Sequence, residues 1–382
     1  MINASANIVI IGGGVTGCSI AYNLAKKGYE DIVLLEKEYL ASGATGRCGA
    51  GIRQQWGTEM NCKLASNSME IFENMNEILG TKRDIELKQE GYLILDYSDR
   101  EMEQFEKNLK LQHSMGIPSK KITVAEAKEI VPHLNTEGVV GATFCKTDGH
   151  ANPFRVTEAY AEAAERLGVD IYTYTEAKDI KVKDGKIVGV ETDKGFIRTN
   201  RVVNAAGGYS KEIGKMVGLD LPVKPERHQI LVTERVEPLQ KPMVMSFSYN
   251  IYCQQTPDGS FIMGFGDPNE PESHNIKESW QFLEEMAEKA VNLLPVLSNL
   301  RVVRQWAGLY NVTPDAQPIL DKANNVDDFY IAAGFSGHGF MIAPMTGIYM
   351  SELILGEEPS IELELNLQRF DKGNLILEPS VV

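Results

Sequence analysis

Three glycines and one glutamate near the N-terminus have the spacing of a dinucleotide-binding site. Gly12, Gly14 and Gly17 form a Gly-x-Gly-x-x-Gly pattern, and Glu36 follows at the end of the next apolar run. Glycines at this spacing allow a tight turn and let a pyrophosphate approach the N-terminus of the following helix. A carboxylate at the position of Glu36 can accept hydrogen bonds from both ribose hydroxyls, and it disfavours the 2′-phosphate of NADP. The pattern therefore predicts dinucleotide binding, with a glycine turn of an ordinary α/β protein as the alternative.

The segments around these glycines predict the elements that such a site requires. Residues 8–11 (IVII) and 32–35 (IVLL) are short apolar runs typical of buried parallel strands, and residues 18–27 predict a helix between them. Together they form a βαβ unit. A second buried strand followed by a glycine cluster occurs near the other end of the chain, at 329–339.

Four stretches of the chain resemble the D-amino-acid-oxidase-like family of FAD-dependent amine oxidoreductases. They are 10–17 (IIGGGVTG), 42–47 (SGATGR) with 51–53 (GIR), 203–210 (VNAAGGYS) and 334–340 (GFSGHGF). Within the family the chain looks most like the β subunits of heteromeric sarcosine oxidase and L-proline dehydrogenase, and the stretch RCGAGIRQQ at 47–55 is closest to the latter. The resemblance implies an α/β plus α+β fold, in which a Rossmann-like FAD-binding domain is interleaved with an antiparallel-sheet substrate domain.

The same resemblance implies that the cofactor is a noncovalently bound FAD. Residues 42–47 would offer backbone N–H groups, hydroxyls and a cation to the pyrophosphate and the flavin, the alternative being a small-residue loop packed on the sheet. Residues 334–339 would bring a helix N-terminus to the flavin, where the dipole stabilises negative charge on the reduced ring. The expected cofactor-binding residues are Gly12, Gly14, Val15, Thr16, Gly17, Glu36, Lys37, Ser42, Thr45, Gly46, Arg47, Gly49, Ala50, Gly51, Ala206, Gly207, Gly337, His338, Gly339, Phe340 and Met341.

An amino-acid substrate needs a cation for its carboxylate and an aromatic or polar cage around its amine. By its place in the family motif, Arg53 is the carboxylate anchor, and a bidentate guanidinium suits that role; a surface arginine is the alternative. The resemblance puts His228, Tyr252, Tyr310 and His338 beside the flavin, although periodicity alone does not say which face of a strand the first three occupy. The implied reaction is oxidation of a secondary amino acid, L-proline or one like sarcosine, to an imine by hydride transfer to flavin N5.

Departures from the monomeric sarcosine oxidases bear on the electron acceptor. Those enzymes carry a lysine after His-Gly-Phe, where this chain has Met341, and a lysine above the flavin, where residues 261–264 (FIMG) hold no cation. Without that cation, superoxide-like states are not stabilised, so we expect a dehydrogenase that passes electrons to a partner. The covalent flavin-linking histidine of bacterial heteromeric sarcosine oxidases has no match, since His150 is out of register. An oxygen-using oxidase acting alone and a non-catalytic flavoprotein assembly subunit remain the alternatives.

The composition excludes several other classes of protein. The 382 residues include 38 Lys and Arg against 53 Asp and Glu, a formal net charge of −15, which argues against nucleic-acid or anionic-membrane binding. The five cysteines form no C-x-x-C pair, as expected for a reducing compartment without structural zinc or a disulfide framework. No signal peptide or membrane-spanning run is evident. We expect a cytoplasmic protein, with peripheral attachment to a membrane through partners as the alternative. The resemblance implies α-type partner subunits and an electron acceptor, for which an FMN at a subunit interface is one candidate.

Dinucleotide signals at both ends of the chain, with antiparallel strands between them, predict two interleaved domains. Strands are expected from 228 to 264, with a hairpin turn at 257–259, and helices over 59–79 and 277–294. The expected FAD-binding domain comprises 1–85, 146–220 and 326–382, and the expected substrate-binding domain comprises 86–145 and 221–325.

Overall fold

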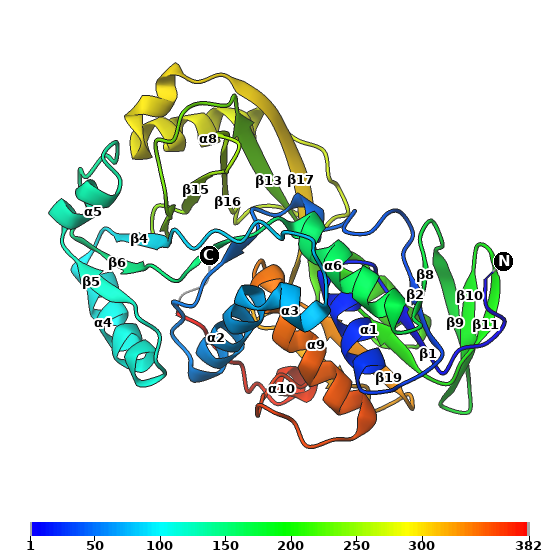
Figure 1. Ribbon diagram of the computed structural model, residues 1–382. Helices are drawn as coiled ribbons and strands as arrows, with labels where there is room; N and C mark the ends of the chain where they lie inside the picture. The colour runs from blue at the N-terminus through cyan, green and yellow to red at the C-terminus, as the bar shows by residue number, and fades with distance from the viewer. Residues whose placement is uncertain (1, 380–382) are drawn as a thin grey trace.

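The computed structural model describes residues 2–379 and is built on two large sheets that lie on opposite sides of the molecule (Figure 1). The first sheet has the strand order β18-β19-β12-β1-β2-β8. Its strands are β1 (Ile8–Ile11), β2 (Ile32–Leu35), β8 (Asp170–Tyr172), β12 (Val202–Asn204), β18 (Ile319–Lys322) and β19 (Phe329–Ala333). All neighbours are parallel except β18, which runs antiparallel to β19.

The two faces of this sheet are covered by different elements, because alternate residues of a strand point to opposite faces. Ile8 and Ile10 pack with the helices of one face, whereas Val9 and Ile11 pack against a small antiparallel sheet and a helix on the other. The covering helices of the first face are α1 (Val15–Lys26), α6 (Pro153–Arg166) and α9 (Gly339–Leu355). The opposite face is covered by β9 (Ala177–Lys183), β10 (Lys186–Thr192), β11 (Gly195–Arg198) and α7 (Ser210–Met216).

The second sheet has eight strands in the order β17-β13-β16-β15-β14-β4-β6-β5. They are β4 (Tyr92–Asp96), β5 (Lys120–Ile122), β6 (Gly141–Cys145), β13 (Lys224–Thr233), β14 (Met243–Ser246), β15 (Ile251–Gln255), β16 (Phe261–Phe265) and β17 (Val302–Val312). One face packs on α5 (Val124–Ile130) and α8 (Trp280–Leu293), with α4 (Asp99–Ser114) beside β5 and β6. The other face of this eight-stranded sheet therefore lies at the junction with the first sheet.

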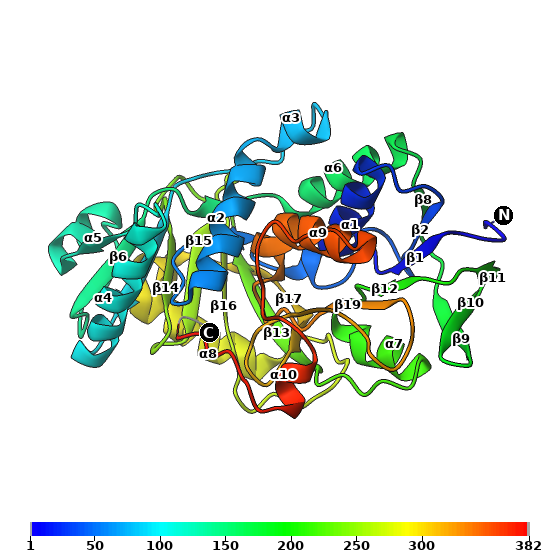
Figure 2. The ribbon, with the colours of Figure 1, turned by 90° about the horizontal axis from the view of Figure 1, so that it is seen from below.

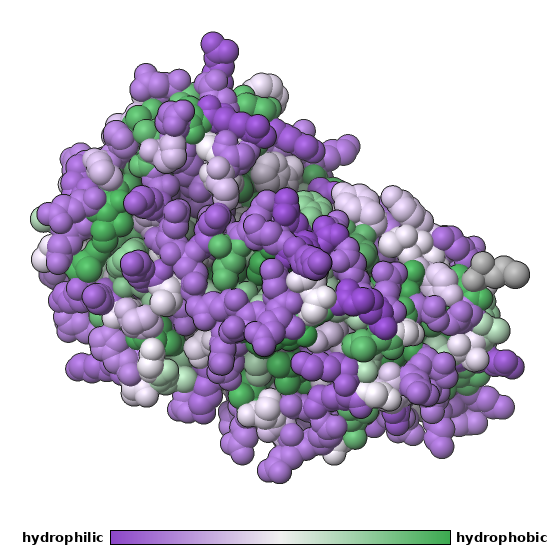
Figure 3. All heavy atoms as spheres, in the orientation of Figure 1, coloured by the Kyte–Doolittle hydropathy of each residue, from purple (hydrophilic) through white to green (hydrophobic). Residues whose placement is uncertain are grey.

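Short segments join the two sheets. The ribbon of β3 (Gly51–Ile52) and β7 (Gly149–His150) lies between them, and α2 (Glu59–Glu73) packs along α9. In Figure 2 the chain after α10 (Gln368–Asp371) turns back towards α2, where the Glu378 carboxylate accepts hydrogen bonds from Gly57 N and Asn61 Nδ2, each at 2.8 Å. The face shown in Figure 3 is largely hydrophilic with scattered hydrophobic side chains. No helix within residues 2–379 is long and apolar enough to cross a membrane.

The mainly parallel first sheet and the largely antiparallel second sheet agree with the expected combination of an α/β part and an α+β part. One pair of the second sheet, β4 with β14, is parallel rather than antiparallel, because these strands are far apart in the chain and no hairpin fixes their direction. The helix expected over 59–79 is two helices, α2 and α3 (Met75–Leu79), separated at Asn74. The domain boundaries stay a prediction. β18 lies in the range expected for the substrate-binding domain, although it pairs with β19, which lies in the range expected for the FAD-binding domain.

Candidate cofactor and substrate site

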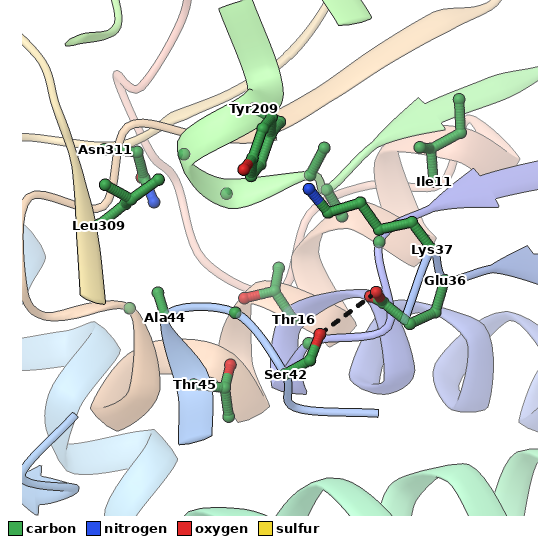
Figure 4. Close-up of a pocket in the computed structure, with 18 of the residues that line it drawn as sticks. Ile11, Thr16, Glu36, Lys37, Ser42, Ala44, Thr45, Tyr209, Leu309 and Asn311 are labelled. Carbon is green, nitrogen blue, oxygen red and sulfur yellow. Dashed lines mark hydrogen bonds between the residues drawn. The ribbon is translucent and has the colours of Figure 1, made fainter. Parts of the chain in front are cut away.

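A cavity of about 370 Å³ lies where the carboxyl ends of β1, β2 and β12 face the end of β17 (Figure 4). This is the edge at which open α/β sheets bind their ligands. Among the expected cofactor residues, those lining the cavity are Gly12, Gly14, Val15, Thr16, Glu36, Lys37, Ser42, Thr45, Arg47, Ala206, Gly207, Gly337, Gly339 and Phe340. Gly17, Gly46, Gly49, Ala50, Gly51, His338 and Met341 are not part of its lining.

The N-terminal glycines form a turn that other residues could not adopt. Gly12 has a φ of +120°, and a Cβ there would lie 2.3 Å from the carbonyl oxygen of Ala205. A Cβ on Gly17 would lie 2.0 Å from the carbonyl oxygen of Gly12, so Gly17 allows α1 to pack closely on the turn rather than facing the cavity. The first backbone N–H groups of α1 are thereby held at the cavity, as the binding of an anion requires.

Glu36 is buried and its carboxylate is held by the surrounding backbone. Oε2 accepts a hydrogen bond from Gly13 N at 2.8 Å, and Oε1 accepts one from Glu38 N at 2.8 Å and one from Ser42 Oγ at 3.3 Å. Figure 4 shows the contact with Ser42 as a dashed line. Each carboxylate oxygen has further lone pairs for a ligand, so Glu36 can both stabilise the turn and accept hydrogen bonds in the cavity.

Residues 42–47 lie across the start of α1. Thr45 Oγ1 accepts a hydrogen bond from Val15 N at 3.2 Å. The guanidinium of Arg47 donates to the carbonyl oxygens of Ser42 and Ala307, each at 3.0 Å, which connects this segment to β17. Glycine is needed at position 46, because a Cβ there would lie 2.4 Å from the carbonyl oxygen of Ala41.

Lys37 lies at another part of the cavity, opposite an aromatic ring (Figure 4). Its Nζ is 3.3 Å from the centroid of the Tyr209 ring, close enough for a cation–π interaction. Tyr209 also stacks on His274, with ring centroids 4.5 Å apart. The expected glycine Gly207 begins the short helix that carries Tyr209, and its φ of +56° is in the left-handed region.

The glycine loop before α9 is fixed to β17 by an asparagine that the sequence analysis missed. Asn311 Oδ1 accepts a hydrogen bond from Phe335 N at 2.5 Å, and Asn311 O accepts one from Ser336 N at 3.0 Å. Gly337 has a φ of +94°, and a Cβ there would lie 2.5 Å from the ring of Tyr310. The loop and the strand are therefore in direct contact at the cavity.

Three of the expected substrate residues form one aromatic stack on the second sheet. The rings of His228 and Tyr310 are stacked with centroids 4.2 Å apart and planes 2° apart. His228 Nε2 lies 3.1 Å from the hydroxyl oxygen of Tyr252. All three side chains are largely buried, and burial lowers the pKa of His228 to about 4 and raises the pKa values of both tyrosines. These groups are thus neutral at physiological pH.

Arg53 and His338 meet at the same indole ring. Arg53 is 4% exposed, and its guanidinium carbon lies 3.9 Å from the centroid of Trp56. His338 contacts that ring edge-on at 5.1 Å between centroids. Burial, with the nearby Arg53 charge, lowers the pKa of His338 to about 3, and neither of its ring nitrogens has a hydrogen-bond partner within residues 2–379. A neutral imidazole with two unpaired nitrogens beside a buried arginine is suited to a polar ligand.

The remaining expected residues surround this region. Gly49 accepts a hydrogen bond from Gln254 Nε2 at 3.0 Å, and Ala50 has a φ of +52°. Gly51 is in β3, and Met341 packs near Trp56 at the start of α9. His150 pairs with Gly51 across the β3–β7 ribbon.

Tyr92 and Asp148 are buried residues of this region that the sequence analysis missed. A Cβ on Gly51 would lie 1.6 Å from the hydroxyl oxygen of Tyr92, so this hydroxyl lies directly against β3. Asp148 accepts hydrogen bonds from Gln54 and Gln55, next to Arg53. No sequence motif marks either residue, because β4 and the β6–β7 connection approach the site only in the folded chain.

The cavity and its residues fit a dinucleotide. A side chain at Gly12 would collide with the backbone of Ala205, so glycine preserves the tight turn at the start of α1, and the acidic Glu36 lies directly after β2, as the ribose of FAD requires.

Comparison with known proteins gives consistent results. The sequence model of the family described as FAD dependent oxidoreductase (DAO) matches residues 7–353. The crystal structure of L-proline dehydrogenase from P. horikoshii is similar with a TM-score of 0.93 and 39% identity, covering 98% of this chain and 100% of that one. Glycine oxidase from Geobacillus kaustophilus has a TM-score of 0.88 and 25% identity, covering 96% and 99%. Sarcosine oxidase subunit beta of Rhodobacter capsulatus is 28% identical over 97% of this chain and 90% of that protein.

Proposed function

The chain belongs to the D-amino-acid-oxidase (DAO) family of FAD-dependent oxidoreductases and acts on the CH–NH group of amino acids; from this premise we propose that its substrate is a secondary amino acid such as L-proline or sarcosine. The product is the corresponding imine, and the electrons pass to a partner or another acceptor rather than to oxygen. L-proline dehydrogenase and sarcosine oxidase subunit beta, two proteins to which the chain is similar, carry these substrates in their names.

The observation that carries the proposal is the buried guanidinium of Arg53 among aromatic side chains. Arg53 is 4% exposed; burial lowers its pKa, and the carboxylates of Glu378 and Asp148 act in the opposite direction. A buried guanidinium can bind the carboxylate of an amino acid through two parallel hydrogen bonds, and such charge-assisted bonds are strong where water is excluded.

The amine then lies among neutral groups. His228, Tyr252, Tyr310 and His338 carry no charge at pH 7, because burial lowers the pKa values of both histidines and raises those of both tyrosines. A neutral, desolvated surrounding favours an uncharged amine, whose lone pair assists cleavage of the neighbouring C–H bond. His228 and Tyr252, 3.1 Å apart, form a pair that can accept or donate a hydrogen bond to the amine.

FAD would be held by the glycine turn at 12–17, by Glu36 and by residues 42–47. When bound, it would accept the hydride that leaves a carbon bonded to the amine nitrogen of the substrate. The protein holds the two reactants close together and excludes water from the space between the sheets.

Two features favour an acceptor other than oxygen. Ile262 of β16 pairs with Gln254, whose side chain reaches Gly49, so residue 262 is on the face of the sheet that looks toward the site. This position carries no cation to stabilise a developing superoxide. The low pKa of His338 keeps that imidazole uncharged as well. We infer that the electron acceptor is a partner of the α-subunit type, and an FMN at the interface with this subunit is compatible with that inference.

A panel of amino acids with an artificial dye as electron acceptor tests the proposal. L-Proline and sarcosine should reduce the dye, and primary amino acids such as glycine and L-alanine should do so at least tenfold more slowly. Equal rates with primary amino acids would reject the assignment to secondary amines. Rapid peroxide formation without dye would identify an oxidase acting alone, and a flavin-loaded protein that oxidises nothing would identify a non-catalytic subunit.

A further inference from the structure

Asp148 is a fully buried carboxylate for which the proposed reaction has no role. It lies in the connection between β6 and β7 and is 0% exposed. A buried carboxylate is costly unless several donors satisfy it, so its partners indicate what it does.

The partners of Asp148 are two consecutive glutamines. Oδ1 accepts hydrogen bonds from the backbone N–H of Gln54 at 2.8 Å and from Gln54 Nε2 at 3.2 Å. Oδ2 accepts one from Gln55 Nε2 at 3.0 Å. Gln55 Nε2 is also 3.2 Å from the carbonyl oxygen of Tyr92. One carboxylate thus fixes two adjacent residues through backbone and side chain together.

These glutamines belong to the turn that presents Arg53. Arg53 Nη1 donates to the carbonyl oxygen of Gln55 at 3.0 Å, and Trp56 Nε1 donates to the carbonyl oxygen of Arg53 at 2.9 Å. The indole ring lies under the guanidinium at 3.9 Å. The direction of the guanidinium therefore depends on the position of residues 54 and 55, which Asp148 holds.

We propose that Asp148 is a positioning residue that fixes the 53–56 turn and so sets the reach of Arg53 toward the substrate carboxylate. The inference rests on the proposed role of Arg53 as the carboxylate anchor. Asp148 contacts neither substrate nor cofactor in this account. It acts through Gln54 and Gln55.

The charges around Asp148 agree with this role. The groups that face it are Arg53, whose charge favours the ionised carboxylate, and Tyr92 and Cys145, which are neutral. Burial raises the pKa of Asp148 to about 6 in spite of its hydrogen bonds. The carboxylate is therefore ionised at pH 7.5, where it can accept all three N–H groups.

The test replaces Asp148 by asparagine and compares the variant with Asp96→Asn. Asp96 is equally buried, in β4, but its Oδ1 accepts a hydrogen bond from Ser98 N, away from the 53–56 turn. Asp148→Asn keeps the shape of the side chain but places an NH2 group against a donor. We expect the KM for the amino acid and the dissociation constant of pyrrole-2-carboxylate, a flat carboxylate probe, to rise about tenfold, with kcat changed less than threefold. Asp96→Asn should change neither constant.

A double-mutant comparison separates positioning from general destabilisation. In an Arg53→Ala background, Asp148→Asn should have no further effect on binding of the probe, since the side chain that it positions is gone. Hydrogen–deuterium exchange gives a readout that needs no substrate. The peptide containing residues 53–56 should exchange faster in Asp148→Asn and not in Asp96→Asn.

The outcomes of these experiments test the role of Asp148 independently of the proposed function. Unchanged exchange at 53–56, or an equal loss of probe binding in both aspartate variants, would overturn the positioning role. A loss of kcat with constant KM would do so as well, because it would assign Asp148 to the chemistry. A wild-type protein that oxidises no amino acid would overturn the proposed function, while the exchange measurement would still decide the role of Asp148.

Discussion

The hydroxyl oxygen of Tyr92 occupies the space that a β-carbon on Gly51 would need, at a distance of 1.6 Å. Gly51 was expected from the sequence to contact the cofactor, and Tyr92 was not expected in the site at all. The close approach brings a strand of the second sheet directly against the segment that leads from the cavity to Arg53. It explains in steric terms why residue 51 has no side chain.

Gly51→Ala should therefore disturb the site through overpacking. The new methyl group must displace Tyr92 or the nearby end of Met243, at a cost of about 1–3 kcal/mol in the free energy of unfolding. Substrate affinity should fall while most of the FAD is retained. Gly266→Ala is the matched control, because a Cβ on Gly266 would have only Asn250 Oδ1 within 4 Å, at an ordinary contact distance of 3.8 Å. Equal melting temperatures for the two variants would show that the contact with Tyr92 is not restrictive.

Replacement of Glu36 should weaken retention of FAD. Glu36→Ala removes the acceptor for the cofactor ribose and leaves Gly13 N–H without the acceptor that Oε2 provides. Glu36→Gln keeps one acceptor oxygen and should retain more flavin. The measurement is the ratio of flavin to protein after extensive dialysis. Full occupancy in the alanine variant would count against this assignment.

A lysine at position 262 should increase the rate at which the reduced protein reacts with oxygen. Its ammonium group would place a positive charge on the face of β16 that looks toward the site, where it stabilises the developing superoxide. Stopped-flow mixing of the reduced protein with aerated buffer measures the rate, and Ile262→Met is the control for a long uncharged side chain. Fast reoxidation of the unmodified protein with stoichiometric peroxide would contradict our view of the acceptor.

His150 should make stability depend on pH. Burial, followed by the charge of Lys88, lowers its pKa to about 4 in the folded protein from 6.5. Between these two pH values the unfolded chain binds more protons than the folded protein. The stabilising contribution of the neutral His150 is therefore present above pH 6.5 and is lost as the pH falls. Between pH 6.5 and 5 the loss is about 2 kcal/mol. Urea unfolding measured at several pH values should show that the free energy of unfolding falls less steeply with decreasing pH for His150→Gln than for the wild type. Equal slopes of the free energy of unfolding against pH would disprove the effect.

The sequence predicts those parts of the site that are formed by residues close together in the chain. Gly12 is in the turn after β1, Gly17 is in the first turn of α1 and Glu36 directly follows β2, so their spacing alone predicts their arrangement. The motif at 334–340 likewise contains both the loop and the start of α9.

The part that sequence did not predict depends on contacts between distant segments. Asn311 fixes the glycine loop, and Asp148 fixes the turn after Arg53, through residues separated by 24 and 94 positions. The parallel pairing of β4 with β14 is of the same kind, since about 150 residues separate Tyr92 from Met243. Spacing carries no information on such pairs without the tertiary structure.

The central claim is that Arg53 anchors the carboxylate of a secondary amino acid next to bound FAD. Anaerobic titration of the purified yellow protein with L-proline and with sarcosine tests it most directly, by the loss of flavin absorbance. We predict that one of these amino acids bleaches the wild-type flavin, and that Arg53→Ala, with its FAD content unchanged, loses about 2–5 kcal/mol of substrate binding. A wild-type flavin that neither compound reduces, or an Arg53→Ala variant bleached at the wild-type substrate concentration, would contradict the account.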